Sequence, residues 1–435
     1  MTVEGGGLAV PVVWSEDCLL HRPAGEVWLG LREDGTEVPE RATVILGSLR
    51  AAGAPIRPAE AHDEAALLAV HDRALVDHLA TIWADWEAGG YPADYGRDRV
   101  VPYVFPTAAM LAGLPLRLPA ATHGRVGMFC YDTMTLVGPG SWEAIRAAAD
   151  AAATAARLVA AGQPAAYALC RPPGHHAAPS GYGGSCYLNN AAVAAEALRQ
   201  AGAGRVAVID VDAHHGNGTQ AIFYDRADVF YASVHVDPGA GWFPHYMGFA
   251  AERGRGAGQG ANRNIPLAPG SGDAPWLAAV AELCAEVQAH GAEAIVLSLG
   301  VDAAAADPES PLQVSAEGYR AAGELIGRLG PVAAIQEGGY DLASLGEYVL
   351  AALTGVEAGR AQHRPAQDDG RAKDRLAPDR PVRDRAAPDR QVQDRQGQDG
   401  RAQFRPAQTV AAQTGAAQTA MPEADQRAGG PRASS

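Results

Sequence analysis

The stretch 206-VAVIDVDAHHGNG-218 decides the fold prediction, because an apolar run ends abruptly in aspartates, histidines and glycines. The run before Asp210 is typical of a strand buried inside a parallel sheet. Asp212 and His214 follow two residues apart, so an extended chain sends both side chains to the same side. Parallel sheets bind ligands outside the carboxyl ends of their strands. We therefore interpret the stretch as part of a metal site rather than as a polar turn.

Strand-like and helix-like segments alternate on both sides of this stretch. The alternation predicts an α/β fold with a parallel sheet covered by helices on both faces. Ser141 is the expected N-cap of the first of these helices. The expected strands are Val126–Tyr131, Ala165–Cys170, Arg205–Asp210, Val229–Val234, Ala294–Leu299 and Val332–Gln336; the expected helices are Ser141–Ala161, Asn189–Ala201, Ala274–His290, Ser315–Leu329 and Leu342–Thr354.

The N-terminal part is less regular. Val10–Trp14 is an expected strand, Pro39–Gly53 an expected helix, and His62–Trp86 one or two amphipathic helices. Gly89–Leu118 is rich in glycine, proline and aromatic residues and is expected to be irregular. Long ordered loops of this kind are often functional, so we expect it at a substrate rim or a subunit contact.

Composition and charge exclude several classes of protein. The net charge of −15 over 435 residues argues against a nucleic-acid-binding protein and suits cationic substrates. Five scattered cysteines are typical of a reduced compartment. The opening MTVEGGGLAVPVVW lacks the pattern of a signal peptide, and no run approaches the ~20 apolar residues of a membrane span. We expect a cytoplasmic protein without nucleic-acid or membrane partners.

The last part of the chain differs in character from the rest. From Asp374 to Asp399 an aspartate recurs every five residues among Ala, Pro and Gln, with no apolar period. Such low-complexity composition is typical of disorder. We therefore divide the chain into a catalytic domain at 1–358 and a disordered tail at 359–435.

Polar groups follow five of the expected strands. One polar strand end is common, but five at the same edge of one sheet predict a single pocket. These strand ends are Cys170–His176, Asp210–Asn217, Val234–Asp237, Gly300–Asp307 and Gln336–Tyr340.

Three of these residues form a candidate metal site. Asp212, His214 and Asp302 are the ligand types that hold a catalytic divalent metal with one open position, zinc above all. His175 and His176 follow two prolines and a glycine, which form a rigid turn able to hold both imidazoles toward the metal.

The paired histidines need partners on their outer ring nitrogens, and Asp210 and Asn217 are the available groups. A carboxylate raises the pKa of one histidine, whereas an amide leaves the other near its ordinary value. The histidine beside Asn217 is then the better general base.

Three further residues belong to the candidate site or to its surroundings. Tyr340 follows two glycines and is placed to hydrogen-bond a developing oxyanion. His215 and His235 are interpreted as structural residues beneath the metal site.

The motifs RPPGHHA (171–177), DVDAHHGNGTQ (210–220), GVDAAAADP (300–308) and QEGGY (336–340) resemble those of the histone deacetylase and acetylpolyamine amidohydrolase family. The resemblance covers roughly Val126–Leu353. VVWSEDCLLHR and VVPYVFPT, nearer the N-terminus, look more like the bacterial acetylpolyamine amidohydrolases.

The resemblance implies a three-layer α/β/α arginase-deacetylase fold with a mostly parallel, eight-stranded central sheet. It implies one zinc ion on Asp212, His214 and Asp302, with His176 as general base and acid. His175, Asp210, Asn217 and Tyr340 match the family's remaining catalytic residues. It also implies a structural potassium ion near Asp210, Asp212, His214 and Ser233, and a homodimer through residues 89–118.

Four positions bear on the substrate. Glu309 falls where polyamine deacetylases of this family carry a glutamate that favours a second ammonium group. Gly184 and Ser185 lie in GGSC, where the family has an aromatic residue before the cysteine as one wall of the acyl-lysine tunnel. Phe243 or Trp242 is expected to form the other wall. Loss of one aromatic wall would widen the tunnel.

The sequence thus predicts a zinc-dependent amidohydrolase that removes an acetyl group from small cationic amines, most readily acetylated polyamines. An acetyl-lysine protein deacetylase is the alternative within this class. A binuclear manganese hydrolase is a second alternative, but Ala304 stands where its extra aspartate is expected. A non-catalytic binding protein on the same scaffold is a third.

Overall fold

The computed structural model describes residues 7–23, 25–91 and 99–363. Its centre is an eight-stranded sheet in the order β4-β1-β5-β10-β9-β6-β7-β8, and every pair of neighbouring strands is parallel. The predicted α/β fold with an eight-stranded sheet is confirmed. The strands are β1 Val12–Trp14, β4 Ile56–Pro58, β5 Ala165–Ala168, β6 Val206–Asp210, β7 Val229–Val236, β8 Asn262–Leu267, β9 Ala294–Leu299 and β10 Val332–Gln336.

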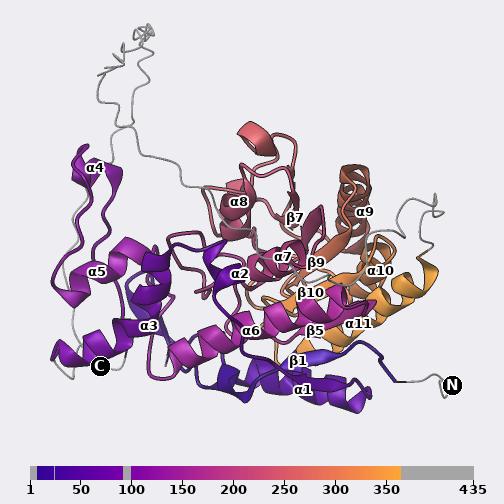
Figure 1. Ribbon diagram of the computed structural model, residues 1–435, viewed down its shortest axis with the longest axis horizontal. Helices are drawn as coiled ribbons and strands as arrows, with labels where there is room; N and C mark the ends of the chain where they lie inside the picture. The colour runs from indigo at the N-terminus through magenta and orange to yellow at the C-terminus, as the bar shows by residue number, and fades with distance from the viewer. Residues whose placement is uncertain (1–6, 24, 92–98, 364–435) are drawn as a thin grey trace, which may run out of the picture. The chain divides into compact units, whose positions relative to one another are not determined.

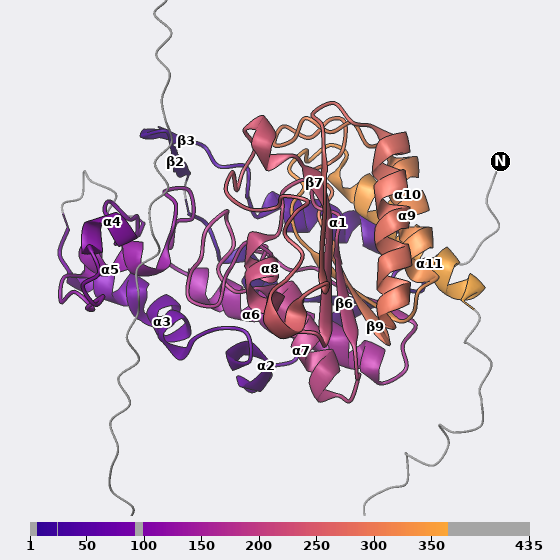
Figure 2. The same ribbon diagram turned by 90° about the horizontal axis from the view of Figure 1, so that it is seen from above.

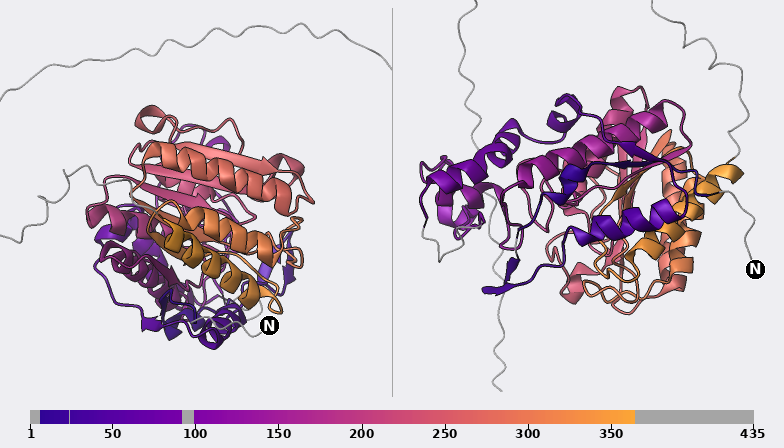
Figure 3. Two further views of the ribbon diagram at one scale, coloured as in Figure 1. Left: turned by 90° about the vertical axis from the view of Figure 1, so that its right-hand side faces the viewer. Right: turned by 90° about the horizontal axis from the view of Figure 1, so that it is seen from below.

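Helices cover both faces of this sheet (Figures 1 and 2). On one face α11 packs against α1 and α10, and α10 packs against α9; Figure 3, left, looks onto this layer. On the other face the alanine-rich α6 and α7 pack against each other, because small side chains allow two helices to approach closely. The helices are α1 Glu40–Ala51, α2 Ala65–Leu68, α3 Arg73–Ala88, α4 Ala108–Leu111, α5 Thr122–Phe129, α6 Ser141–Ala160, α7 Asn190–Gln200, α8 Asn217–Phe223, α9 Asp273–His290, α10 Ala316–Gly327 and α11 Leu345–Gln362.

The five strands with polar ends are neighbours in the sheet. They form its centre in the order β5-β10-β9-β6-β7, and β6 is buried along its whole length. The register sets Asp210, at the end of β6, beside Ser298 of β9 and Ser233 of β7. The loops that follow these strands therefore converge at one edge of the sheet.

Two details of the prediction are wrong. Residues 126–131 do not form a strand, because α5 covers Thr122–Phe129. Ser141 is the first residue of α6 rather than its N-cap, which is Gly140. The Ser141 hydroxyl is buried and accepts a hydrogen bond from the Gly138 amide, so it stabilises the preceding turn instead.

Three parts of the fold were not predicted. The edge strands β4 and β8 extend the sheet on either side. A separate antiparallel hairpin joins β2 (Glu26–Trp28) to β3 (Leu31–Glu33). The excursion predicted at Gly89–Leu118 is largely irregular over its described residues, 89–91 and 99–118, apart from the short helix α4. Part of that excursion, 92–98, lies outside the described residues, as does the tail from 364 onward.

Candidate active site

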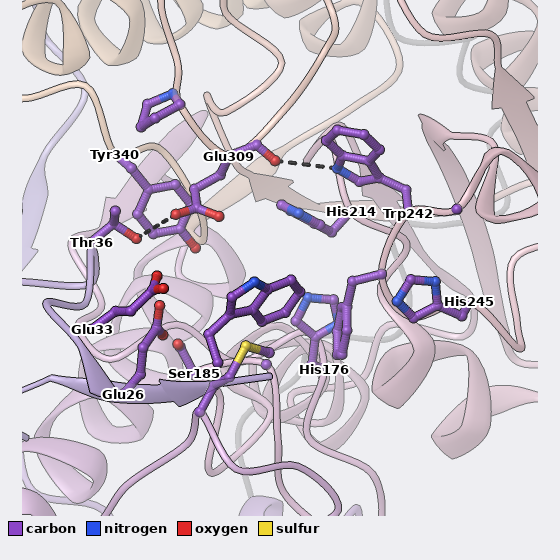
Figure 4. Close-up of a pocket in the computed structure, with 16 residues that line it drawn as sticks. Glu26, Glu33, Thr36, His176, Ser185, His214, Trp242, His245, Glu309 and Tyr340 are labelled. Atoms are coloured by element: carbon purple, nitrogen blue, oxygen red, sulfur yellow. Dashed lines mark hydrogen bonds between the residues drawn. The ribbon is translucent and has the colours of Figure 1, made fainter. Parts of the chain in front are cut away.

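One pocket opens at the edge of the sheet where the five loops converge (Figure 4). His176, His214 and Tyr340 line its inner end, and Glu309 lines its mouth. The remaining lining residues come from the β2–β3 hairpin and from five loops. These residues are Glu26, Trp28, Glu33, Thr36, Met134, Gly184, Ser185, Gly241, Trp242, Phe243, His245 and Pro308.

The candidate metal ligands lie together at the inner end. Ligand atoms of Asp212, His214 and Asp302 are all within 4.8 Å of one another. His214 Nδ1 is 2.9 Å from Asp302 Oδ2 and 3.4 Å from Asp212 Oδ1, and both carboxylates are fully buried. Two carboxylates and one imidazole in a buried cluster are the donor set that a catalytic divalent metal prefers.

Electrostatics also favour a cation here. Burial, together with the charge of Asp212, raises the pKa of Asp302 to about 8. Two buried carboxylates this close stabilise a positive charge between them. The glycines of GVD and EGGY leave room for both side chains. A Cβ on Gly300 would lie 1.9 Å from Asp212 Oδ2, and one on Gly338 would lie 2.6 Å from an oxygen of each aspartate.

His175 is paired with a carboxylate. Its Nδ1 lies 3.1 Å from Asp210 Oδ2, and its ring is buried. Burial lowers the pKa of His175, but the charges of Asp212 and Asp210 outweigh this effect and raise it to about 10. Tyr231 donates a hydrogen bond to the same Asp210 oxygen, which fixes the carboxylate in place. The two carboxylates therefore favour the protonated, cationic form of His175.

His176 is paired with an amide. Its Nδ1 lies 2.7 Å from Asn217 Oδ1, and since that oxygen only accepts, Nδ1 carries the proton. Nε2 is then the unprotonated nitrogen of the neutral ring, and it has no hydrogen-bond partner in the described chain. Burial and the charge of His175 hold the pKa of His176 well below its ordinary value, rather than near it as the amide partner alone predicts. The arrangement gives a neutral imidazole with a free basic nitrogen at the pocket.

Tyr340 is held at the pocket by its backbone. Its amide donates to Asp307 Oδ2 at 2.6 Å. The Arg41 guanidinium lies 4.6 Å from the centroid of the Tyr340 ring and donates to the Gly339 carbonyl. Gly339 has a φ of 122°, which favours glycine, so the second glycine of EGGY allows the turn that brings the phenol to the pocket.

The four predicted substrate residues all line the pocket. Glu309 Oε1 accepts a hydrogen bond from the Thr36 hydroxyl at 2.8 Å, which holds the carboxylate at the mouth. The Phe243 ring meets the His176 ring edge to face at 4.8 Å. A Cβ on Gly184 would lie 2.5 Å from the His176 ring, so only glycine fits there. Ser185 follows with a φ of 60°.

His215, Ser233 and His235 do not line the pocket. The two histidines are fully buried, with ring centroids 4.7 Å apart. His215 Nε2 lies 3.1 Å from Gln220 Oε1, and His235 bridges the Ser233 hydroxyl and the Gly248 carbonyl, each at 2.8 Å. These contacts agree with the structural role interpreted for both histidines.

Sequence reasoning missed several residues that support the site. Glu337 is fully buried and accepts hydrogen bonds from the Gly174 and His175 amides at 2.7 and 3.0 Å, which fixes the backbone of the paired histidines. Burial raises the pKa of Glu337 to about 7. Its place in QEGGY was the available sign. The sequence held no such sign for Arg41, because this residue lies on α1, far from the motifs in the sequence.

The sequence and the structure are similar to those of known proteins. Residues 35–356 match the histone deacetylase domain. The chain is 41% identical over 348 residues to acetylpolyamine amidohydrolase 1 of Pseudomonas aeruginosa, covering 79% of this chain and 98% of that protein. It is 40% identical over 348 residues to acetylpolyamine amidohydrolase of Mycoplana ramosa, covering 79% and 99%.

A solved structure shares the fold. The crystal structure of acetylpolyamine aminohydrolase from Burkholderia pseudomallei superposes with a TM-score of 0.75 at 38% identity. The match covers 81% of this chain and 99% of that one.

Proposed function

We propose that this chain, which belongs to the histone deacetylase family and is a deacetylase, removes the acetyl group from acetylated polyamines. One observation carries the choice of substrate. The Glu309 carboxylate stands at the mouth of the same pocket that holds His176 and Tyr340. A carboxylate at that position attracts an ammonium group on the part of the substrate that lies outside. The relatives named acetylpolyamine amidohydrolase add support to this choice.

Zinc is the metal that we assign to Asp212, His214 and Asp302. When bound there, it would polarise the acetyl carbonyl and the attacking water. The buried cluster fits such an ion by its donor types and by the proximity of its two carboxylates.

The chain's own groups supply the proton transfers. His176 Nε2 takes a proton from the attacking water and then delivers it to the leaving amine nitrogen. Tyr340 donates its hydroxyl proton in a hydrogen bond to the oxyanion that develops on the acetyl carbonyl. His175, cationic beside Asp210, stabilises negative charge at the same site.

A potassium ion is part of the same proposal. The register pairs Asp210 with Ser233, next to the loop that carries Asp212 and His214. Backbone carbonyls at such a strand end are suitable ligands for a hard monovalent cation. Its function would be to hold the Asp210–His214 loop in place beneath the candidate zinc ligands.

Comparing a small substrate with a peptide tests the proposal. We expect acetylspermidine or acetylcadaverine to be hydrolysed with a higher kcat/KM than an acetyl-lysine peptide. Equal or better turnover of the peptide would favour a protein deacetylase instead. Metal analysis of the same purified enzyme checks the zinc assignment, because about two metal ions per chain would favour a binuclear centre.

A homodimer is also proposed, through residues 89–118, of which the structure describes 89–91 and 99–118. Apolar side chains on this segment are largely exposed, and Leu114 is exposed to 71%. Exposed apolar patches of this kind mark interaction sites. The other members of the patch are Tyr103, Met110, Leu116 and Leu118. Light scattering after size exclusion should show a dimer, and Leu114→Glu should yield monomer.

We also propose that the protein is cytoplasmic. All five cysteines are unpaired and buried, which suits a reducing cytoplasm. Among the residues that the structure describes, no helix has the length and apolar character to cross a membrane.

A further inference from the structure

The proposed role of His176 as general base depends on which way the Asn217 amide is turned. With Asn217 Oδ1 facing His176 Nδ1 at 2.7 Å, the ring proton lies on Nδ1 and Nε2 is the free base. If the amide were turned over, its Nδ2 would donate to Nδ1, and the proton of the neutral ring would move to Nε2. Nε2 could then no longer take a proton from water. A neighbouring group that fixes the amide therefore controls the base.

Tyr131 contacts the other side of this amide. Its hydroxyl donates to the His176 carbonyl at 2.9 Å. Asn217 Nδ2 lies 3.5 Å from the Tyr131 hydroxyl oxygen and 3.5 Å from the His176 carbonyl oxygen. Because the hydroxyl proton is directed at the carbonyl, the Tyr131 oxygen offers only lone pairs to the amide. Nδ2 thus faces two acceptors, and a turned amide would bring Oδ1 against both, which is unfavourable between buried groups.

The chain around Tyr131 holds its side chain in this place. The ring packs against Gly183, where a Cβ would lie 2.2 Å from a ring carbon. The Tyr131 amide donates to the Tyr182 carbonyl at 3.1 Å. Burial of the phenol, followed by the charge of Asp132, raises the pKa of Tyr131 well above its ordinary value. The hydroxyl therefore keeps its proton and remains a donor to the His176 carbonyl.

We propose that Tyr131 is a positioning residue for the deacetylation, because its hydroxyl orients the Asn217 amide and thereby keeps the ring proton of His176 on Nδ1. Tyr131 does not line the pocket, so it acts on the reaction only through these two residues. What it controls is the availability of His176 Nε2 and not the binding of substrate. The inference rests on the proposed function, because it assumes that Nε2 is the general base.

Tyr131→Phe tests the inference, because it keeps the ring on Gly183 and removes only the hydroxyl. We expect kcat on acetylcadaverine to fall about three- to tenfold, as loss of one hydrogen bond implies, and KM to stay unchanged. The control is Tyr103→Phe, which removes a hydroxyl from a side chain that is 71% exposed and does not line the pocket. The control should behave like the wild type.

A spectroscopic measurement reports the tautomer directly. Long-range proton–nitrogen correlation spectra of enzyme labelled in its histidines distinguish a neutral ring protonated on Nδ1 from one protonated on Nε2. A His176→Ala variant identifies the signals of this residue. We expect the Nδ1 form in the wild type and a measurable share of the Nε2 form in Tyr131→Phe. The same tautomer in both proteins would overturn the inference.

A second background separates orientation of the amide from simple support of the backbone. Asn217→Ala removes the amide, so no orientation remains to be set. Adding Tyr131→Phe to this variant should cause no further loss of kcat. If the hydroxyl only supported the His176 carbonyl, its removal would cause the same loss in either background. An equal loss in both backgrounds would therefore overturn the inference.

The spectra also separate failure of the inference from failure of the proposed function. A wild-type enzyme that hydrolyses no acetylated polyamine would contradict the proposed function, and a change of tautomer in Tyr131→Phe would still support the orienting role of Tyr131. Hydrolysis of acetylcadaverine with the same kcat in the wild type and in Tyr131→Phe would overturn the inference and leave the proposed function intact.

Discussion

The inner end of the pocket and its mouth are built in different ways. At the inner end the side chains come from loops that directly follow buried strands, and Asp212 and Asp302 are themselves fully buried. At the mouth, Trp28 and Glu33 come from a two-stranded hairpin outside the main sheet, and their side chains are exposed. Rigidly held groups suit bond making and breaking, whereas exposed groups suit recognition of a flexible amine. Mutations at the inner end should therefore change kcat for every substrate, whereas mutations at the mouth should change only the substrate preference.

The largest effect is expected for Asp302→Ala. The change removes one of the three candidate metal ligands and leaves Asp212 and His214 incomplete. We expect zinc content to fall, and kcat/KM to fall about a thousandfold or more on charged and neutral substrates alike, as several kcal/mol of lost transition-state stabilisation implies. Metal analysis and kinetics on the same preparation check this. Full activity with full zinc content would contradict the ligand assignment.

Tyr340→Phe should follow in size. The variant keeps the ring beside Arg41 but removes the hydroxyl that we propose stabilises the oxyanion. Loss of one such donor lowers kcat by about 100- to 1,000-fold. KM should change little, and zinc content should stay normal, which separates this residue from the metal ligands. A normal kcat would mean that Tyr340 only packs in the loop.

Asn217→Asp should have an intermediate effect with a distinct pH dependence. A carboxylate beside His176 Nδ1 would raise the pKa of that histidine, so a larger fraction would be protonated at neutral pH. The acid limb of the kcat/KM profile should move to higher pH, with a loss of roughly tenfold at pH 7. Asp210→Asn is the companion variant: it should impair activity without moving that limb upward, because it changes the partner of His175.

The contrast between the two regions also explains what the sequence could predict. Asp212 and His214 stand in one short motif after a buried strand, and parallel topology brings such strand ends together. Residues 126–131 form a short apolar run that fits a strand or a buried helix equally well, and the structure places α5 there. Strand β8 contains polar residues such as Asn264, which is buried because its amide donates to Gln220. Only tertiary contacts make such a segment a strand.

The hairpin was out of reach for a related reason. Each of its strands has three residues, too few to show a period, and Leu29 occupies the turn at a φ of 47°, where glycine is the usual residue. Glu26 and Glu33 look like ordinary surface charges in the sequence. Their proposed role in recognition depends on Glu309, which is far from them in the sequence but lines the same pocket. Candidate catalytic residues at the strand ends were therefore easier to find in the sequence than candidate recognition residues at the mouth.

At the mouth, Trp28→Ala should give a smaller and more selective loss than any change at the inner end. Trp28 and Ser185 both line the pocket. Ser185 stands at the position where the family has an aromatic wall residue. Removing the indole should raise KM a few-fold for a long acetylated amine and leave kcat unchanged, because contact with a few methylenes contributes about 1–2 kcal/mol at most. Ser185→Phe in the Trp28→Ala background should restore part of the loss. A fall in kcat instead would place Trp28 in the catalytic step.

The smallest effect is a pH dependence of substrate preference. Glu26 has a pKa of about 7, so it is protonated and neutral below that pH and charged above it. The substrate's free amine stays cationic throughout, with an ordinary amine pKa of about 10.4. The ratio of kcat/KM for acetylcadaverine to that for N-hexylacetamide, which carries a methyl group in place of the ammonium, should therefore rise a few-fold between about pH 6 and pH 8. The ratio cancels titration of His176, because both substrates undergo the same chemistry. Burial is the main cause of the raised pKa of Glu26, followed by the charges of Glu309, Asp132 and Glu33. Glu26→Gln should flatten the ratio, and a wild-type ratio already flat over this range would show that Glu26 does not meet the ammonium group.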